Sequence, residues 1–511
     1  MTLNRRRFLQ QTSATLAALT LTPHHLFAAT EATLNTPSGK LRGQVKDGIR
    51  VFRGIPFAQP PIGPSRFRPP VPLKPWNGTR NATNFAAAAL QPDDLGTRHS
   101  EDCLYLNLWA PTGPGPFPVF VWIHGGGFTG GRSFAPIFDG TEFARNGIVL
   151  VSVAYRLGVF GFMDLEPLLG PAYADSGNNA LRDLTASLQW VHSNIAAFDG
   201  DPTRVTVGGE SAGAKATAAL MAIPEAASLF HSAISESGGG ERINTLPQAA
   251  NVAHLYGNLW RTAHPSDATT FNDILTAKPA DLIQTQSAFV ATSDRHFPFR
   301  SEVGSTFLPK RPVDLVADGS FKNKRLLIGT NRDESAAFLG PHPAADPTPR
   351  DLGNLSLAAF NEVFAKYKSI YPDLSDQQLR IRAVTAEEYW IPSVRMAEAQ
   401  TQSNSSTWMY RLDYTKPSGP LANEAYHALD LSLVWQKPDS IESADTTAAP
   451  IALQMHQAWV AFILGNTPAA PNLPDWPTYN LETRPTMIFA PTPHLDNNPN
   501  QPERELWNNT L

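Results

Sequence analysis

The sequence predicts an α/β protein with a mostly parallel central sheet flanked by helices. Three observations support this fold class. Short apolar runs of strand length recur along the chain, longer segments of helical periodicity separate them, and a Gly-x-Ser-x-Gly turn joins one strand to one helix. Strands are expected at residues 119–123, 148–153, 205–207, 233–234, 326–328 and 407–410.

Composition narrows the class of protein further. The 511 residues are 42% hydrophobic and carry 41 basic against 46 acidic side chains, with no basic stripe that would bind nucleic acid. No apolar run in the sequence has the length of a membrane-spanning helix. The single cysteine, Cys103, excludes a disulfide framework and a zinc site built from several thiolates. These features predict a soluble globular protein.

Residues 1–30 have the character of an export signal. Arg5, Arg6, Phe8 and Leu9 resemble the twin-arginine (Tat) pattern, and a modest apolar stretch follows them. The segment contains three arginines and no acidic residue. We therefore predict a bacterial protein that is exported already folded, to the periplasm or outside the cell. A disordered basic tail is the alternative interpretation.

The strand expected at 119–123 leads directly into the glycine-rich segment 124–128, which reads His-Gly-Gly-Gly-Phe. Consecutive glycines allow the backbone to approach a substrate and to turn its N–H groups inward. The same pattern contributes to the oxyanion hole of lipases and esterases. The predicted donors are the N–H groups of Gly126 and Gly127, together with that of Ala212 in the turn described below.

The strand expected at 205–207 ends in Gly209-Glu210-Ser211-Ala212-Gly213, and an Ala-rich helical segment follows. The turn is so tight that a side chain at Gly209 or Gly213 would collide with a neighbouring element. It holds the Ser211 hydroxyl clear of the backbone, at the positive end of a helix. We predict Ser211 as a nucleophile, the alternative being a structural serine in a glycine-rich turn.

The remaining elements are expected to be helical. Residues 179–194 place apolar side chains at helical spacing, which predicts a crossover helix. Residues 240–300 and 340–400 lack strong strand signals. We interpret these two segments as helical insertions packed over one end of the sheet.

Further motifs make the sequence resemble the type-B carboxylesterase and cholinesterase branch of the α/β-hydrolase superfamily. The resemblance covers most of the chain after residue 30, and it implies the α/β-hydrolase fold with helical insertions over the active site. It also implies a single catalytic domain over residues 31–511. The motifs that carry it are Phe52–Ala58, Arg66-Phe67, Ser100–Asn107, Tyr155-Arg156-x-Gly158, Phe198–Pro202, Gly209–Gly213, Ser237-Gly238, Gly329–Glu334 and Ala425–His427.

The resemblance supplies the partners of Ser211 that spacing alone does not select. It places the acid on Glu334 and the base on His427, in the Ser, Glu, His order of α/β-hydrolases. It implies that Ser237 hydrogen-bonds near this pair, that Glu210 orders nearby water, and that neither metal nor cofactor is needed. Ser211 would attack an ester carbonyl while His427 accepts its proton and later passes it to the leaving alcohol.

The chain also departs from the family pattern. Many relatives pair the cysteine equivalent to Cys103 with an upstream cysteine, but Ala89 stands in the partner's place, so the loop 89–103 is expected to be unclamped. Cholinesterases carry a choline-stacking Trp in this loop, and none occurs between Asn77 and Cys103, which argues against a choline substrate. His124 is interpreted as structural.

The predicted function is therefore an exported serine carboxylesterase acting on uncharged, fairly apolar esters. A small-molecule ester is the expected partner, and the oligomeric state stays open. Amidase, carbamate hydrolase or lactonase activity with the same triad is the alternative, and a non-catalytic binding module is a third reading. Five phenylalanines either line a substrate pocket or belong to the core: Phe128, Phe160, Phe162, Phe297 and Phe299.

Overall fold

The computed structural model describes residues 30–92, 96–266, 270–340, 342–437, 447–508 and 510, so the predicted export signal, apart from Thr30, lies outside the described residues. Thirteen strands of these residues form one sheet, with β4 (Thr79–Asn81) paired to β2. In spatial order the other strands are β1 (Thr30–Thr36), β2 (Gly39–Lys46), β3 (Ile49–Pro56), β7 (Tyr105–Pro111), β9 (Val149–Val153), β8 (Phe117–Ile123), β10 (Gly200–Glu210), β11 (Ser232–Glu236), β14 (Arg325–Asn331), β15 (Thr407–Leu412), β16 (Pro485–Phe489) and β17 (His494–Asn497).

The centre of the sheet is parallel and its margins are antiparallel. Every neighbouring pair from β9 through β8, β10, β11, β14 and β15 to β16 is parallel. The pairs β1–β2, β2–β3, β3–β7, β7–β9 and β16–β17 are antiparallel. This is the α/β-hydrolase fold that the sequence predicts, and each of the six expected strands belongs to the parallel centre.

Helices cover both faces of the sheet, and the expected helix at 179–194 is α3 (Asn179–Asn194). The remaining helices are α1 (Thr141–Arg145), α2 (Glu166–Leu169), α4 (Ala212–Ala222), α5 (Pro224–Ala227), α6 (Leu246–Ala263), α7 (Asp273–Thr276), α8 (Pro279–Thr292), α9 (Pro312–Ala317), α10 (Ala336–Leu339), α11 (Leu357–Phe364), α12 (Tyr367–Ile370), α13 (Asp376–Thr385), α14 (Ile391–Gln402), α15 (Leu429–Val434), α16 (Ala448–Ile463) and α17 (Gln501–Leu506).

Strand β8 shows why the apolar runs of the sequence become central strands. Val119, Val121 and Ile123 belong to one hydrophobic cluster, whereas Phe120 and Trp122 belong to a second cluster. All five side chains are buried. Because successive side chains point to opposite faces, a strand covered on both faces needs apolar residues at every position. The core therefore lies on both sides of the sheet.

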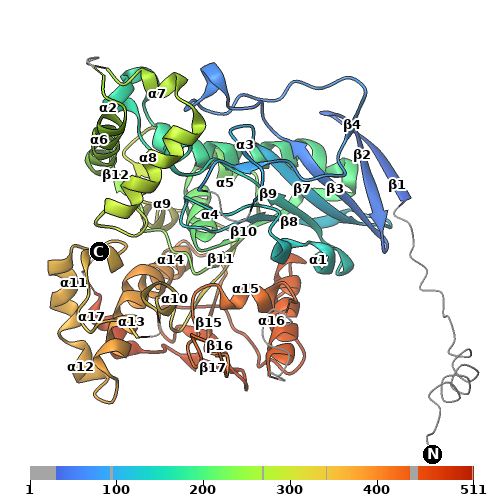
Figure 1. The fold of residues 1–511 in the computed structure, drawn as a ribbon. Coiled ribbons are helices and arrows are strands. Elements are labelled where there is room, and N and C mark those ends of the chain that lie inside the picture. Colours follow the sequence, from blue (N-terminus) through green and yellow to red (C-terminus); the bar gives the residue numbers. More distant parts are fainter. Residues whose placement is uncertain are drawn as a thin grey trace, which may run out of the picture.

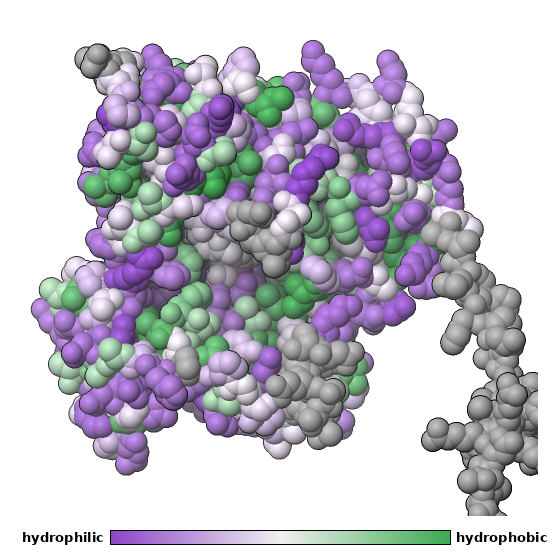
Figure 2. Space-filling model, viewed as in Figure 1, coloured by the Kyte–Doolittle hydropathy of each residue, from purple (hydrophilic) through white to green (hydrophobic). Residues whose placement is uncertain are grey.

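The two predicted insertions are helical and lie along the same side of the sheet. Figure 1 shows α6, α7 and α8 in one group and α11 to α13 in another, both away from the edge formed by β1. The first insertion also contains the short strands β12 (Asn244–Thr245) and β13 (Glu302–Val303), which the sequence did not predict. Figure 2, in the same view, shows a hollow between the two groups, with apolar side chains along its lower margin.

Strand register brings three loops to one end of the sheet. Gly209 of β10 pairs with Ile123 of β8, Glu210 pairs with Glu236 of β11, and Glu236 pairs with Gly329 of β14. Since neighbouring parallel strands end at the same edge, the segments that follow β8, β10 and β14 meet there. Within the described ranges, no helix combines the length and apolar character needed to cross a bilayer.

Candidate active site

Ser211 occupies a sharp turn between β10 and α4. Its backbone has φ 56° and ψ −121°, which is an unfavourable conformation for a residue with a side chain. Two hydrogen bonds hold the turn: the Ser211 N–H donates to the Glu236 carbonyl (2.9 Å), and the Lys215 N–H donates to the Ser211 carbonyl (3.0 Å). The strain is localised at the residue predicted to be the nucleophile.

The two glycines of the turn are required by close backbone contacts, as predicted. A Cβ at Gly213 would lie 2.1 Å from the Ile123 carbonyl oxygen, and one at Gly209 would lie 2.5 Å from the Gly213 carbonyl carbon. Neither contact involves a side chain that could move away. The packing of α4 against β8 and β10 therefore depends on glycine at both positions.

Glu334 and His427 lie in direct contact, although 93 residues separate them. The distance between His427 Nδ1 and Glu334 Oε2 is 2.6 Å. The other carboxylate oxygen, Oε1, accepts hydrogen bonds from the Ser237 hydroxyl and from the Asn331 N–H (2.7 Å). Glu334 is fully buried, so these three donors replace water around its carboxylate. Ser237 thus contacts the His–acid pair, where the sequence placed it.

Glu210, predicted as a nearby charge, contacts His427 directly. One of its carboxylate oxygens is 3.1 Å from His427 Nε2, although this oxygen accepts no hydrogen bond. Burial raises the pKa of Glu210 to about 8. Burial is also the largest influence on the pKa of His427 and lowers it, but the carboxylates of Glu210 and Glu334 outweigh burial and raise this pKa above its ordinary value.

Ser211 and His427, both among the described residues, share no hydrogen bond. The imidazole Nε2 instead faces Glu210, the residue immediately before Ser211 in the chain. Glu210 is therefore a direct neighbour of the imidazole.

The glycine-rich loop after β8 packs directly on the turn that carries Ser211. A Cβ at Gly125 would lie 2.7 Å from Glu210 Oε2 and 3.1 Å from Ser211 Cβ. Gly126 and Gly127 adopt φ values of 116° and 62°, which favour glycine. In the described part of the chain, the N–H groups of Gly126, Gly127 and Ala212 donate no hydrogen bond. The three predicted donors are therefore free to bind an oxyanion.

Cys103 forms no disulfide with the described residues, as the sequence predicts, and backbone and side-chain hydrogen bonds hold the described parts of this loop, residues 89–92 and 96–103. The Gln91 side chain donates to the Gly131 carbonyl (2.9 Å) and accepts from the Gly131 N–H (2.9 Å). Strand β5 (Ala88–Ala89) also pairs with β6 (His99–Ser100). Cys103 is a free, buried thiol whose pKa is raised, chiefly by burial. It lacks the thiolate character of a nucleophile.

His124 has a structural environment, in agreement with its interpretation from the sequence. Its ring stacks on Tyr155 with 4.6 Å between centroids, and its Nδ1 lies 2.8 Å from the Gly125 carbonyl oxygen. Burial lowers the pKa of His124 to about 4, which keeps the ring neutral.

Of the five phenylalanines considered, Phe297 is the one that contacts the site. A Cβ at Gly127 would lie 2.4 Å from the Phe297 ring. The other four belong to aromatic pairs in the core: Phe128 with Phe162, Phe160 with Phe67, and Phe299 with Phe289.

Two aromatic residues at the site were missed by the sequence interpretation. Phe338 and Tyr389 contact the His427 ring, with centroid distances of 5.0 and 4.9 Å. Phe338 lies in α10, one helical turn after Glu334, so its position could have been inferred. Tyr389 belongs to a π-helical turn at Ala386–Trp390 within the second insertion, and no sequence motif marks it.

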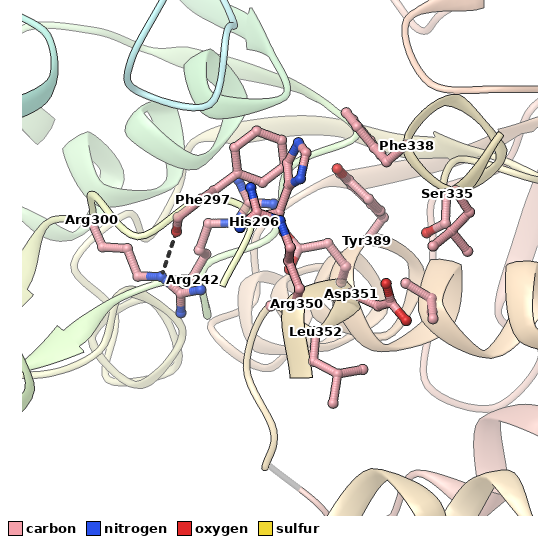
Figure 3. A pocket seen from close by; sticks show the side chains of 14 residues that line it. Arg242, His296, Phe297, Arg300, Ser335, Phe338, Arg350, Asp351, Leu352 and Tyr389 are labelled. Atoms are coloured by element: carbon pink, nitrogen blue, oxygen red, sulfur yellow. Dashed lines mark hydrogen bonds and ion pairs between the residues drawn. The ribbon is translucent and has the colours of Figure 1, made fainter. Parts of the chain in front are cut away.

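A cavity of about 280 Å³ adjoins these rings (Figure 3). Neither Ser211 nor His427 is among its lining residues. The cavity adjoins the site through Phe297, which packs on Gly127, and through Phe338 and Tyr389, which contact the His427 ring. The rest of the wall is strongly basic and includes Arg242, Arg300 and Arg350.

Comparison with known proteins agrees with this geometry. Residues 30–507 match the model of a family described as the carboxylesterase family. The chain belongs to the carboxylesterase family. It is 34% identical over 493 residues to the para-nitrobenzyl esterase of Bacillus subtilis (strain 168), covering 93% of this chain and 98% of that relative.

Two further comparisons extend over most of the chain. The fumonisin B1 esterase of Sphingopyxis macrogoltabida is 32% identical over 468 residues, which is 87% of this chain and 84% of that protein. A solved structure of a thermophilic para-nitrobenzyl esterase superposes with a TM-score of 0.84 at 33% identity, covering 93% of this chain and 100% of the other. This member of the carboxylesterase family is an enzyme, a carboxylic ester hydrolase.

Proposed function

We propose that the protein is a serine carboxylesterase with Ser211 as nucleophile, His427 as general base and Glu334 as the acid that orients the imidazole. The observation that carries the proposal is the 2.6 Å contact between His427 Nδ1 and Glu334 Oε2, at the strand end where Ser211 is held on a strained turn. A serine nucleophile near a histidine that a buried carboxylate orients is the arrangement that acyl transfer requires.

In the proposed first step, Ser211 Oγ forms a bond to the ester carbonyl carbon while His427 Nε2 accepts the hydroxyl proton. The N–H groups of Gly126, Gly127 and Ala212 stabilise the oxyanion of the tetrahedral intermediate. The ester C–O bond then breaks, and His427 gives its proton to the leaving alcohol. A water molecule repeats the sequence on the acyl-enzyme, which releases the carboxylic acid and regenerates Ser211.

His427 must turn from Glu210 toward Ser211 for this step. Hydrogen bonds between catalytic groups are often long in unliganded enzymes and shorten when substrate is bound. Burial raises the pKa of Glu210 to about 8, so Glu210 and His427 compete for one proton near neutral pH. When Glu210 holds this proton, no ion pair keeps the imidazole beside it.

An apolar group next to the reacting ester fits the surroundings of the Ser–His pair. Phe297, Phe338 and Tyr389 surround Gly127 and His427, and Phe338 keeps 38% of its surface exposed. This supports the predicted preference for an apolar ester.

Ser211→Ala tests the mechanism. We expect hydrolysis of para-nitrophenyl esters to fall by about 10⁴-fold or more, measured as kcat/KM, because nucleophile and base act as a unit. Ser228→Ala, which alters an exposed serine outside the site, is the matched control and should keep full activity. Undiminished hydrolysis by the folded Ser211→Ala variant would refute the mechanism. An amide and a carbamate in the same panel measure the alternative activities.

We also propose that residues 1–30 export the folded enzyme to the periplasm or the medium. The support is the pattern of Arg5, Arg6, Phe8 and Leu9, and the family match begins only at residue 30. Replacing Arg5 and Arg6 by Lys should leave the esterase in the cytoplasm of a bacterial host, as shown by cell fractionation. Arg7→Lys is the control. Unchanged export of the double variant contradicts the proposal.

A further inference from the structure

The cavity shown in Figure 3 shares its wall with the candidate active site. Phe297 lines the cavity and packs on Gly127, while Phe338 and Tyr389 line it and contact the His427 ring. These three side chains thus belong both to the cavity and to the surroundings of the candidate active site. The cavity is thus placed to receive the part of a substrate that extends beyond its ester group.

The carboxylates that line the cavity all form ion pairs, whereas two of its arginines form none with the described residues. Its two carboxylates already have cationic partners: Glu388 contacts Arg242 and lies 3.4 Å from Lys215, and Asp351 lies 2.6 Å from Arg380. No described carboxylate forms an ion pair with Arg300 or Arg350, the other two arginines of the wall. Arg350 donates instead to three backbone carbonyls.

Arg300 is the least satisfied of these cations. It is 5% exposed, and its one hydrogen bond to the described residues is a 3.3 Å contact from Nε to the Phe297 carbonyl. Burial lowers the pKa of Arg300 to about 9, with Arg242 and Arg295 adding to the effect. A guanidinium group buried without a carboxylate is costly in free energy unless an anion binds to it.

Arg242 contributes further unused donors, although its guanidinium is paired with Glu388 and lies 4.5 Å from the centroid of the Phe297 ring. Its side chain is almost fully buried, and its Nε and Nη1 atoms have no hydrogen-bond partner in the structure. Figure 3 shows Arg242 and Arg300 on one side of the cavity, with Phe338 and Tyr389 on the other. The cavity therefore has an apolar side next to His427 and a basic side beyond it.

We infer that this cavity binds a carboxylate carried by the substrate, so that the enzyme acts on esters in which a short apolar segment links the ester to a carboxylate. The planar guanidinium group binds a carboxylate through two parallel hydrogen bonds, which the free donors of Arg242 and Arg300 can supply. A cavity of 280 Å³ holds a short chain, on the order of nine water volumes.

This inference rests on the proposed esterase function and revises the prediction of uncharged substrates. The ester itself and its neighbouring segment stay apolar, whereas the far end of the substrate is anionic. The carboxylate belongs either to the acyl portion, as in a half-ester of a dicarboxylic acid, or to the alcohol portion. The two arms of the experiment below distinguish these sources.

The experiment compares matched pairs of esters at fixed ionic strength. Monoethyl adipate and ethyl hexanoate differ by a carboxylate on the acyl side, and 4-acetoxybenzoate and 4-methylphenyl acetate differ by a carboxylate on the alcohol side. We expect the anionic member of one pair to have the higher kcat/KM, by about tenfold or more. The arm that shows this preference identifies the portion of the ester that enters the cavity.

Arg300→Gln should lower the anionic-to-neutral ratio of kcat/KM in that arm by about tenfold to a hundredfold, because it removes a charge-assisted hydrogen bond. Arg300→Lys keeps the charge and should retain part of the preference. Arg145→Gln, which changes an exposed arginine of α1, is the matched control and should leave the ratio unchanged.

Two outcomes separate this inference from the proposed function. If the wild type hydrolyses the neutral esters, shows no anionic preference in either arm and keeps its ratios in Arg300→Gln, the cavity inference is overturned and the esterase mechanism stands. If no ester is hydrolysed, the proposed function fails. Calorimetric titration of adipate then tests the cavity independently: binding that weakens in Arg300→Gln supports it, and absence of binding to the wild type contradicts it.

Discussion

Glu334 and Glu210 both lie against the His427 imidazole, at 2.6 and 3.1 Å, yet their surroundings differ. Glu334 accepts hydrogen bonds from a histidine, a serine and a backbone N–H. One oxygen of Glu210 accepts none, and burial raises the pKa of this residue to about 8.

This difference shows how two glutamates can take different roles beside one histidine. The donors around Glu334 stabilise a negative charge in a fixed position, which suits the residue that orients His427. Glu210 lacks such donors and can hold a proton at neutral pH. We therefore expect substitution of Glu334 to abolish most of the esterase activity, and substitution of Glu210 to change mainly its pH dependence.

Of the variants of Glu334, Ser237, Glu210 and Lys215, Glu334→Gln should have the largest effect and cause the greatest loss of activity. The amide cannot carry the charge that stabilises protonated His427, and one of its groups would present an N–H in place of an acceptor. We expect kcat/KM to fall by about 10³- to 10⁴-fold. The isosteric control is Glu210→Gln. Equal decreases in kcat/KM in the two variants would show that Glu334 and Glu210 do not differ in role.

Ser237→Ala should have an intermediate effect. It removes the hydroxyl donor to Glu334 Oε1 and leaves the Asn331 N–H in place. Loss of one hydrogen bond to a buried carboxylate predicts a decrease in kcat of about tenfold. Steady-state kinetics measure it, with circular dichroism as the control for folding. An unchanged kcat would mean that the Ser237 hydroxyl does not help to fix Glu334.

Glu210→Gln should shift the pH profile more than it lowers the maximum rate. Activity requires neutral His427, so it falls as pH drops through the pKa of His427, which is raised above its ordinary value of 6.5. Glu210 contributes to that rise, and its loss should move the acid limb of the kcat/KM profile to lower pH. A shift to higher pH contradicts the assigned role of Glu210.

Lys215→Met should have the smallest effect of the four variants, and we expect it in the free energy of unfolding. Lys215 and Arg242 share the carboxylate of Glu388, and Lys215 Nζ has no hydrogen-bond partner. Burial lowers the pKa of Lys215 from 10.5 to about 8, so the charged form destabilises the fold fully below pH 8 and progressively less up to pH 10.5.

The free energy of unfolding of Lys215→Met should therefore equal or exceed that of the wild type at pH 7, by about 1 kcal/mol, because Arg242 still balances Glu388. Denaturant titration measures this difference, and the advantage should shrink as pH rises from 8 toward 10.5. A decrease of several kcal/mol in the free energy of unfolding would show that both Lys215 and Arg242 are needed to balance the charge of Glu388.

The strands, the Ser211 turn and the glycine-rich loop could be predicted because each is encoded locally. An apolar run marks a strand that is buried on both faces, and the Gly-x-Ser-x-Gly spacing marks the turn, in which Gly209 approaches the Gly213 backbone. Glu334 and His427 required the family resemblance, because 93 residues separate them and no local pattern links the two.

The residues that shape the cavity could not be predicted in this way. Tyr389 and Arg242 reach the site through tertiary packing of the insertions, and their neighbours in the sequence form no motif. Of five phenylalanines with similar local sequence, Phe297 lies at the site because its loop packs on Gly127. The hydrogen bonds between the Gln91 side chain and the Gly131 backbone could not be predicted either, because a side chain that bonds to a distant backbone group produces no periodic pattern in the sequence.

The most direct test of the account is to locate the covalent intermediate. We predict that phenylmethylsulfonyl fluoride or a para-nitrophenyl phosphonate adds a single group to the protein, which intact mass measurement counts and peptide mapping assigns to Ser211. The Ser211→Ala variant should remain unlabelled and inactive. An adduct on a different residue, or full hydrolysis of esters by a protein that is not labelled at Ser211, would contradict the account.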